Sequence, residues 1–189
     1  MSYELNANST NLKTYTNSGY RPGANALIRT IWYFINILFF INPLNPFNFS
    51  KRLLLRLFGA KVGKGVVIKP SVNIKYPWRL SIGDYTWIGE KVWIDNLDEV
   101  VIGSNVCISQ GAMLLTGNHN YKKTSFDLIT KPINLEDGAW LGAKAVVCPG
   151  VTVGSHALLT VGSIATGDLD KYSIYQGNPA IKIRERVIK

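Results

Sequence analysis

The sequence contains only two histidines, and one of them stands where a regular pattern of the chain is interrupted. His119 lies in the segment TGNHNY, whereas His156 lies in VGSHALL, within an ordinary stretch of that pattern. A neutral histidine can act as a general base toward a hydroxyl or an amine. We therefore expect His119 to be the catalytic residue and His156 to be structural or exposed to solvent.

Other catalytic chemistries lack the residues that they need. Two distant histidines do not supply the ligand set of a zinc site, so no metal is expected. The sequence has no GxSxG motif for a nucleophilic serine. Cys107 and Cys148 lie in regular apolar segments without a CxxC motif. We expect both thiols to be reduced and buried, as in a cytoplasmic protein.

A repeat of six residues defines the framework that must position His119. A period of six fits neither an α-helix nor simple strand alternation, but it fits a short strand followed by a turn. Three such units close one triangular coil, and successive coils pair as parallel strands. We therefore predict a parallel β-helix over residues 61–170, from which residues 116–131 protrude as a loop that carries His119. The fifteen repeat positions are Val62, Ile68, Ile74, Ile82, Ile88, Ile94, Ile102, Ile108, Leu114, Leu135, Leu141, Val147, Val153, Leu159 and Ala165.

The ends of the chain differ from this framework. Residues 1–23 are polar and rich in Asn, Ser and Thr, so we expect them to be flexible. Residues 24–60 are apolar and basic and are predicted to form a helical extension, and residues 171–189 form a basic tail. The run ANALIRTIWYFINILFFI is short for a membrane span, and SKRLLLRLFG sets basic residues beside leucines. Packing on the fold and peripheral contact with the inner membrane both remain open.

The net charge is +9, yet no nucleic-acid-binding motif accompanies it. A phosphate-bearing cofactor or substrate explains the charge better than nucleic acid, which we do not expect as a partner. Four tryptophans stand off the inward positions of the repeat, and outward aromatic residues favour an interface or a ligand surface. We therefore expect a closed homo-oligomer, most simply a trimer. The four are Trp78, Trp87, Trp93 and Trp140.

Two long segments resemble one family of enzymes. The run TGNHNYKKTSFDLITKPINLEDGAWLGAKAVVCPGVTVG resembles hexapeptide O-acetyltransferases of the galactoside and maltose acetyltransferase group, and GSIATGDLDKYSIYQGNPAIKI resembles the end of the same domain. The runs RLFGAKVGKGVVIKPSVNIKYPWRLSIGD and VWIDNLDEVVIGSNVCISQGA are most similar to acetyltransferases of colanic acid and related exopolysaccharide biosynthesis. The resemblance covers residues 45–189. It implies that the β-helix is left-handed, with a short N-terminal helical segment and a protruding loop.

The resemblance also implies a reaction. An acetyl group would pass from acetyl-CoA to a sugar hydroxyl in exopolysaccharide or lipopolysaccharide biosynthesis, with His119 as general base and no metal. The protein would be a homotrimer with active sites between subunits. A backbone N–H in the Gly142–Ala143 region would stabilise the oxyanion. The cofactor-binding positions that match the family are Trp140, Gly142, Ala143, Val161, Gly162, Thr166, Lys182 and Arg184.

The acceptor side departs from the sugar acetyltransferases. Their acceptor-binding asparagine is replaced by Gly89, and their adjacent aspartates are replaced by Asn96 and Leu97. Asp95 lies next to these positions and could orient His119, hold sugar hydroxyls, or be a solvated turn residue; Asp98 and Glu99 are alternatives. The acceptor would be a saccharide or a lipid-linked saccharide. The substrate-binding residues that we expect are Asp95, Asn96, Asn118 and Trp87.

Two other functions remain open at this point. One is N-acetylation of a nucleotide-linked amino sugar by the same type of enzyme. The other is a non-catalytic solenoid that serves as a scaffold or binding module. His119 on an interrupting loop argues against the second of these.

Overall fold

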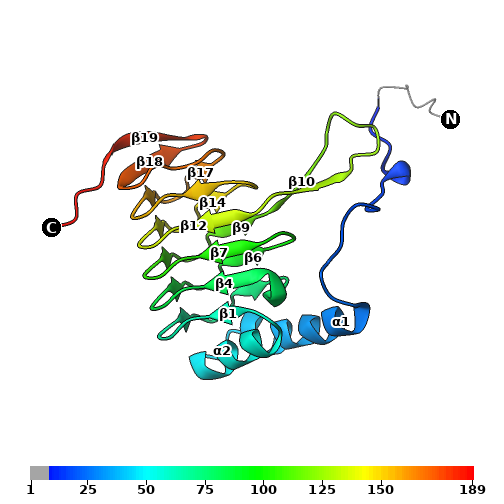
Figure 1. Ribbon diagram of the computed structural model, residues 1–189, viewed down its shortest axis with the longest axis horizontal. Helices are drawn as coiled ribbons and strands as arrows, with labels where there is room; N and C mark the ends of the chain where they lie inside the picture. Colours follow the sequence, from blue (N-terminus) through cyan, green and yellow to red (C-terminus); the bar gives the residue numbers. More distant parts are fainter. Residues whose placement is uncertain (1–8) are drawn as a thin grey trace.

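The computed structural model describes residues 9–189, so the flexibility expected for residues 1–8 lies outside the described part. From Lys61 onward the chain winds into stacked coils of three short strands each (Figure 1). The predicted parallel β-helix, with an N-terminal helical segment and a protruding loop, is confirmed. The coils comprise β1 (Lys61–Val62), β2 (Val67–Ile68) and β3 (Asn73–Ile74); β4 (Leu80–Ile82), β5 (Trp87–Ile88) and β6 (Trp93–Asp95); β7 (Val100–Ile102), β8 (Cys107–Ile108) and β9 (Met113–Leu115); β12 (Ile133–Leu135), β13 (Trp140–Leu141) and β14 (Val146–Val147); and β15 (Thr152–Val153), β16 (Leu158–Leu159) and β17 (Ile164–Ala165).

Equivalent strands of successive coils form three flat sheets, one on each side of the triangular coil. We name them sheet A (β1-β4-β7-β12-β15), sheet B (β2-β5-β8-β13-β16) and sheet C (β3-β6-β9-β14-β17). The register preserves the repeat, because Ile68 lies opposite Ile88, which lies opposite Ile108. Identical positions therefore stack along the whole β-helix.

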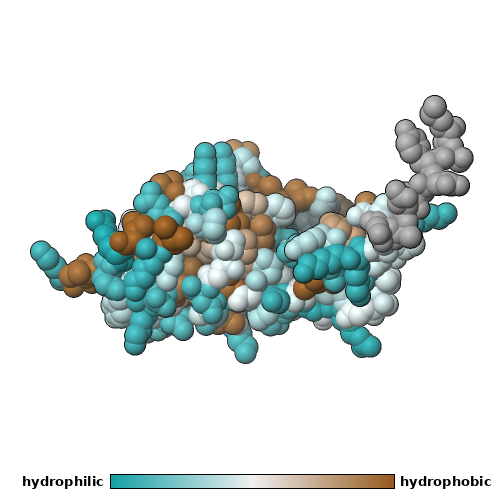
Figure 2. All heavy atoms as spheres, turned by 90° about the horizontal axis from the view of Figure 1, so that it is seen from above, coloured by the Kyte–Doolittle hydropathy of each residue, from teal (hydrophilic) through white to brown (hydrophobic). Residues whose placement is uncertain are grey.

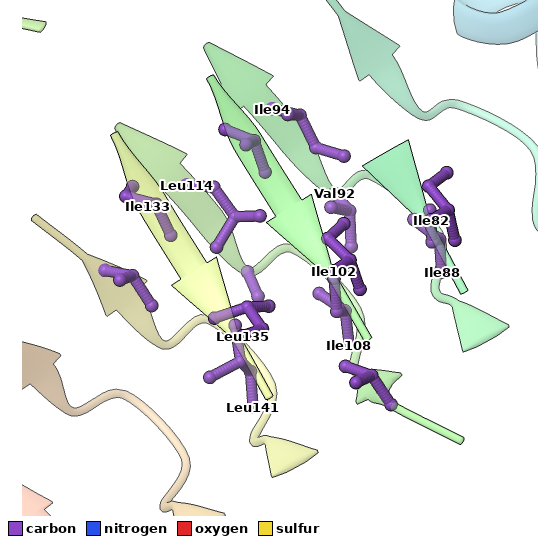
Figure 3. Close-up of a cluster of buried hydrophobic side chains, with 14 of the residues drawn as sticks. Ile82, Ile88, Val92, Ile94, Ile102, Ile108, Leu114, Ile133, Leu135 and Leu141 are labelled. Atoms are coloured by element: carbon purple, nitrogen blue, oxygen red, sulfur yellow. The ribbon is translucent and has the colours of Figure 1, made fainter. Parts of the chain in front are cut away.

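The interior is filled by two stacked positions of each repeat. All fifteen predicted repeat positions are buried except Val62, which is only partly so. The sequence analysis missed a second inward position two residues earlier, occupied for example by Val92 in front of Ile94 (Figure 3). Aliphatic side chains at both positions interdigitate between coils and stabilise the fold through burial of apolar surface.

Three helical segments cover the first coil: α1 (Ala26–Ile35), the π-helix η2 (Asn36–Ile41) and α2 (Asn48–Leu57) (Figure 1). Coil 1 has no preceding coil to bond with, so its backbone groups need other partners. The Lys51 ammonium donates to the carbonyl oxygens of Ile68 and Lys69, both at 3.1 Å. The Trp32 indole N–H donates to the carbonyl oxygen of Ile74 at 2.9 Å.

Other polar side chains of α2 also bond this edge. Asn48 accepts the Ile68 N–H at 2.6 Å, Arg52 donates to the Val66 carbonyl, and Arg56 donates to the Val62 carbonyl. These contacts show that the basic residues after Ser50 pack against the β-helix, and they leave contact of the outer side of the helices with a membrane untested. Within residues 9–189, no helix combines the length and hydrophobicity needed to cross a bilayer.

The opposite end of the β-helix is covered by its own chain. The segment expected as a basic tail contains β18 (Ser173–Gly177) and β19 (Ala180–Glu185). Strand β18 adds in parallel to β16, and β19 pairs antiparallel with β18. Sheet B therefore ends in a hairpin. Short 3₁₀ helices η1 (Leu12–Thr14) and η3 (Pro77–Arg79) complete the elements described.

Replacing Lys51 tests the importance of the capped edge. Lys51→Met keeps most of the aliphatic stem but leaves the Ile68 and Lys69 carbonyls without their donor, which should lower the free energy of unfolding by about 2 kcal/mol. Urea denaturation followed by circular dichroism measures this. The exposed Lys61 on the same coil provides the control, since Lys61→Met should change stability by less than about 0.5 kcal/mol. Equal effects of the two substitutions would contradict a capping role.

Candidate active site

His119 lies on a β-hairpin that leaves the β-helix between sheets C and A. Strands β10 (Gly117–His119) and β11 (Leu128–Thr130) are antiparallel, with His119 opposite Leu128 (Figure 1). The hairpin projects from the corner where β9 would otherwise lead directly to β12. The loop predicted from the interrupted repeat is therefore an ordered two-stranded arm.

The hairpin tip holds the His119 ring in a defined state. Nδ1 lies 2.9 Å from the backbone carbonyl oxygen of Phe126, and the two rings stack with centroids 4.5 Å apart. A carbonyl oxygen can only accept, so Nδ1 carries the proton of the neutral ring. Nε2 then has a free lone pair and can accept a proton from another molecule. The group that orients the ring is thus a backbone carbonyl, and no acidic side chain is required.

The polar N-terminal residues follow the same corner of the molecule. We call residues 9–23 the N-terminal strap; they were expected to be flexible, but they make specific contacts. The Asn11 N–H donates to the Thr124 carbonyl at 2.7 Å, and the Tyr15 ring lies 5.8 Å from the His119 ring. Strap and hairpin enclose a pocket of about 340 Å³, which is lined by Thr16, Asn17, Ser18, Gly19, Tyr20, Asn120, Lys123, Asp127, Leu128, Ile129 and Thr130.

A tyrosine fastens the strap to the β-helix itself. The Tyr20 hydroxyl donates to the Leu97 carbonyl at 3.0 Å, and its burial raises the pKa of Tyr20 to about 12. The phenol therefore remains a hydrogen-bond donor at any physiological pH. This contact fixes the strap to the same corner one coil below the hairpin, at the segment that follows Asp95.

The predicted substrate-binding residues have different surroundings. The Asp95 carboxylate pairs with Lys75 at 2.9 Å and lines a second pocket of about 370 Å³ together with Arg29 and Trp93. Asn118 is exposed beside His119, and its side chain accepts the His119 N–H at 2.8 Å. Among residues 9–189, Asp95 pairs with Lys75, His119 bonds to Phe126, and no contact joins Asp95 to His119. Asp95 and Asn118 remain available to a ligand, but they border separate surfaces.

Asn96 is occupied by the fold. Its side chain is fully buried, its oxygen accepts the Tyr76 N–H at 2.9 Å, and its amide group donates to the carbonyls of Tyr76 and Arg79. These bonds join the first two coils at the corner. An amide with all these partners serves the corner rather than a substrate.

Most of the predicted cofactor residues lie away from His119. Trp140 is on sheet B, where its indole N–H donates to the Ser109 hydroxyl at 3.0 Å, and Trp87 is exposed on the same sheet. Gly142, Ala143, Val161 and Gly162 occupy the corner between sheets B and C. Sheet B is the side of the triangle opposite the corner that carries the hairpin. One subunit therefore does not bring these residues to its own His119.

The remaining predicted residues are divided between the two regions. Thr166 follows β17 and lies on the corner between sheets C and A, as the hairpin does. Lys182 and Arg184 lie on β19, where Lys182 pairs with Glu185 at 2.8 Å and with Asp170 at 3.5 Å. The hydrogen bond to Glu185 raises the pKa of Lys182. Arg184 forms no ion pair among the described residues and is the freer cation for a phosphate.

The other titratable candidates play no part in this arrangement. His156 stacks on Tyr172 at 4.7 Å, and its Nδ1 lies 2.8 Å from the Ser155 hydroxyl. Cys107 and Cys148 are unpaired and only half-buried, and burial raises the pKa of each thiol. Thiols with raised pKa values are poor nucleophiles at neutral pH. Within residues 9–189, no group of His, Cys, Asp and Glu side chains could hold a metal ion.

Comparisons with known proteins agree with this fold. The sequence is 40% identical to WcaF of Escherichia coli strain K12, an acetyltransferase assigned to colanic acid biosynthesis, over 89% of this chain and 92% of the relative. The chain belongs to the hexapeptide-repeat acetyltransferases. It is also 29% identical to the galactoside O-acetyltransferase of the same organism, over 79% of this chain and 75% of the relative. No protein-family model matches the sequence.

Solved structures of hexapeptide-repeat acetyltransferases superpose on most of the chain. The acetyltransferase VCA0836 from Vibrio cholerae, in complex with acetyl coenzyme A, has a TM-score of 0.77 at 23% identity and covers 88% of this chain and 92% of its own. A galactoside acetyltransferase in complex with coenzyme A has a TM-score of 0.74 at 26% identity, covering 84% and 80%. The family resemblance and the enzyme class expected from the sequence are thereby confirmed.

Two contacts of the His119 ring were not predicted from the sequence. Phe126 supplies both the carbonyl and the stacked ring that hold His119, and its position inside the interrupting loop was the only available signal. Tyr15 approaches the same ring from the strap, more than one hundred positions away in the sequence. No spacing rule connects such distant segments.

Asn96 provides a test of the division between structural and substrate-binding residues. Asn96→Ala removes three hydrogen bonds at a buried corner and should lower the free energy of unfolding by about 2–3 kcal/mol. Acetyl transfer by the folded fraction should keep the acceptor KM of the wild type. Urea denaturation and initial-rate kinetics at low temperature separate the two effects. An unchanged stability with a raised KM would instead assign Asn96 to the acceptor.

Proposed function

We propose that this protein transfers an acetyl group from acetyl-CoA to a saccharide hydroxyl in the biosynthesis of an exopolysaccharide or lipopolysaccharide. The observation that carries the proposal is the bond from His119 Nδ1 to the Phe126 carbonyl, which leaves Nε2 as a base on an exposed hairpin. The 40% identical relative assigned to colanic acid biosynthesis supports a saccharide acceptor. The acceptor is free or carried on a lipid.

His119 moves the proton of the reaction. Nε2 accepts the proton of the acceptor hydroxyl as the oxygen becomes a nucleophile, and the imidazolium later returns that proton to the departing sulfur. Acetyl-CoA, when bound, supplies the thioester carbonyl that the acceptor oxygen attacks. Through its hydrogen bond and its stacked ring, Phe126 keeps Nε2 directed outward while Nδ1 stays protonated.

The oxyanion donor can be narrowed to one backbone group. In the Gly142–Ala143 region, the Gly142 N–H already donates to the Leu159 carbonyl at 2.8 Å. The Ala143 N–H has no hydrogen-bond acceptor among residues 9–189. It stands at the second position of a turn whose third residue, Lys144, has a φ of 58°. Ala143 is thus the candidate donor to the developing oxyanion.

The surface around Ala143 suits the pantetheine arm and requires a second subunit. Trp140 and Val161 are exposed apolar residues, and the space above Gly162 is open. Since sheet B lies opposite the hairpin of its own chain, His119 meets these residues only across an interface. A closed homotrimer, in which each hairpin approaches the sheet B side of its neighbour, supplies three identical sites.

The base and the oxyanion donor can each be removed by one substitution. His119→Ala should lower kcat about 10²–10⁴-fold, and Ala143→Pro should lower it about 10²–10³-fold by deleting one N–H. Proline is tolerated in this turn, because Pro70 stands at the equivalent position of coil 1, followed by Ser71 with a φ of 61°. Release of the CoA thiol, with and without a saccharide acceptor, measures the rate.

Glu90 occupies the same turn position in coil 2, so Glu90→Pro is the matched control and should keep the wild-type rate. Turnover at the wild-type rate by His119→Ala would eliminate the proposed mechanism. Acetylation of a nucleotide-linked amino sugar in place of a hydroxyl would favour the N-acetyltransferase alternative. Absence of any CoA binding in calorimetry would favour a non-catalytic scaffold.

Mixed oligomers test whether the site is shared. Neither His119→Ala nor Ala143→Pro subunits are active alone, but random co-assembly should restore about one quarter of the sites if each combines residues of two subunits. The two variants are unfolded together, refolded together and assayed for thiol release. Mixing without refolding is the control. If the refolded mixture stays as inactive as the separate variants, each site belongs to a single chain.

A further inference from the structure

Helix α1 and the π-helix η2 expose apolar side chains on the side that faces away from the β-helix. The buried side is marked by Trp32, Asn36 and Phe40, which recur at intervals of four and contact coil 1. The opposite side is also apolar, although it is exposed. Its stripe has helical spacing and consists of Leu27, Ile31, Phe34 and Leu38. A helix that is apolar on both sides is typical of one that is covered on both sides.

Helix α2 buries Lys51 together with Leu55 and leaves other apolar residues exposed. Lys51 is completely buried against coil 1, whereas Phe49 and Leu57 are 72% and 70% exposed. The preceding connection adds Leu44, which is 85% exposed, and Phe47. We call these exposed side chains the apolar helix face: Leu27, Ile31, Phe34, Leu38, Leu44, Phe47, Phe49, Leu53 and Leu57. A patch of this kind on a soluble monomer marks an interaction surface.

Most of the excess positive charge lies in residues 5–83, which include the helices and coil 1, although Lys13 is on the strap and Lys64 and Lys75 pair with Asp84 and Asp95. Residues 5–83 contain eleven Lys and Arg and not a single Asp or Glu, while residues 84–189 contain ten basic and eleven acidic residues. Lys61 and Lys69 are exposed on coil 1, and neither forms an ion pair within residues 9–189. Helices α1, η2 and α2 together form what we call the N-terminal cap. Exposed apolar area and unbalanced positive charge thus occur together on this cap and on coil 1.

We propose that the apolar helix face docks on an anionic lipid bilayer. Insertion of the exposed Leu, Ile and Phe side chains at the acyl boundary removes their apolar surface from water, and the surrounding lysines are attracted to anionic headgroups. A second copy of this chain is a poorer occupant, because it would bring an equally positive surface against the first. Charge complementarity therefore selects the bilayer.

The opposite end of the β-helix carries a smaller excess of positive charge, because residues 168–189 contain five basic and three acidic residues. Figure 2, which views the molecule from above, shows hydrophilic residues over much of that face, with apolar residues in separate groups. Ile181 and Val187 are among the exposed apolar residues near the C-terminus, and basic and acidic side chains are interspersed with them. In a closed trimer with parallel β-helices, all three apolar helix faces would point to the same bilayer and bind together.

Docking has a consequence for the acceptor that rests on the proposed function. An enzyme held at the bilayer by its N-terminal cap meets acceptors carried on lipids, and the N-terminal strap leads from this cap to the His119 hairpin. A saccharide linked to a membrane lipid is therefore the acceptor class that the surface selects.

Vesicle binding by the full-length protein tests the proposal. The variant Leu27→Gln/Ile31→Gln/Phe34→Gln/Leu38→Gln leaves the buried stripe intact and should lose at least about a hundredfold in partition to vesicles of phosphatidylglycerol and phosphatidylethanolamine. Lys61→Gln and Lys69→Gln should each weaken binding about fivefold. The wild type should bind more weakly to phosphatidylcholine vesicles than to the anionic vesicles. Added salt should weaken its binding to the anionic vesicles. Co-sedimentation measures each partition.

A matched variant and two further measurements make the outcome unambiguous. Ile181→Gln/Val187→Gln removes exposed apolar side chains at the opposite end and should bind vesicles as the wild type does. Failure of the wild type to bind anionic vesicles, or undiminished binding by the four-glutamine variant, would overturn the proposal. A smaller oligomer for that variant in analytical ultracentrifugation would overturn it in favour of a contact between copies. The four-glutamine variant should bind CoA with the affinity of the wild type, as measured by calorimetry. If the wild type did not bind CoA, that result would count against the proposed function and not against docking on the bilayer.

Discussion

The open edge of the first coil is the constraint on which the rest of the structure depends. A β-helix satisfies its backbone by pairing each coil with the next, so its two ends leave unpaired N–H and C=O groups that must find partners or face aggregation. At the C-terminal end the chain supplies a hairpin, β18–β19, as an additional layer of sheet B. At the N-terminal end it supplies side chains. Lys51, Arg52 and Arg56 have long, flexible side chains that donate to the carbonyl oxygens of coil 1. A helix surface without such side chains could not reach these oxygens.

This solution determines what faces outward. Helix α2 turns Lys51 and Arg52 toward the β-helix, and the apolar residues Phe49 and Leu57 lie on its other side. If the helices only protected the sheet edge, alanine or glutamate at these outer positions would make the protein more soluble. The contacts with coil 1 would allow either residue there. The large apolar side chains on the outer side therefore need a reason beyond the stability of the edge, and contact with lipid provides one.

The sequence predicts the elements that repeat and fails where contacts are specific to one place. Stacked Ile and Leu positions recur at a fixed period, so fold, sheet count and the protruding segment follow from the pattern alone. The strap does not repeat, and its attachment depends on single bonds such as Tyr20 to Leu97. Asn96 was predicted to bind substrate from its neighbourhood in the sequence, but local order cannot reveal that its amide is used by the backbone of the coil below. The burial of Lys51 could not be predicted from the sequence, because the usual preference for exposed lysine is reversed only by a tertiary contact.

The distribution of charge separates two explanations of the basic composition. A phosphate-bearing cofactor would account for an excess near Trp140, Ala143 and Arg184, yet residues 84–189 contain one more acidic than basic residue. The positive excess instead surrounds the N-terminal cap, far along the β-helix from β19. Local cations such as Arg184 can still meet a phosphate, since one contact needs only one free guanidinium. A field that extends over the whole cap acts on a surface of opposite charge, and the lipid headgroup layer is a surface of that kind.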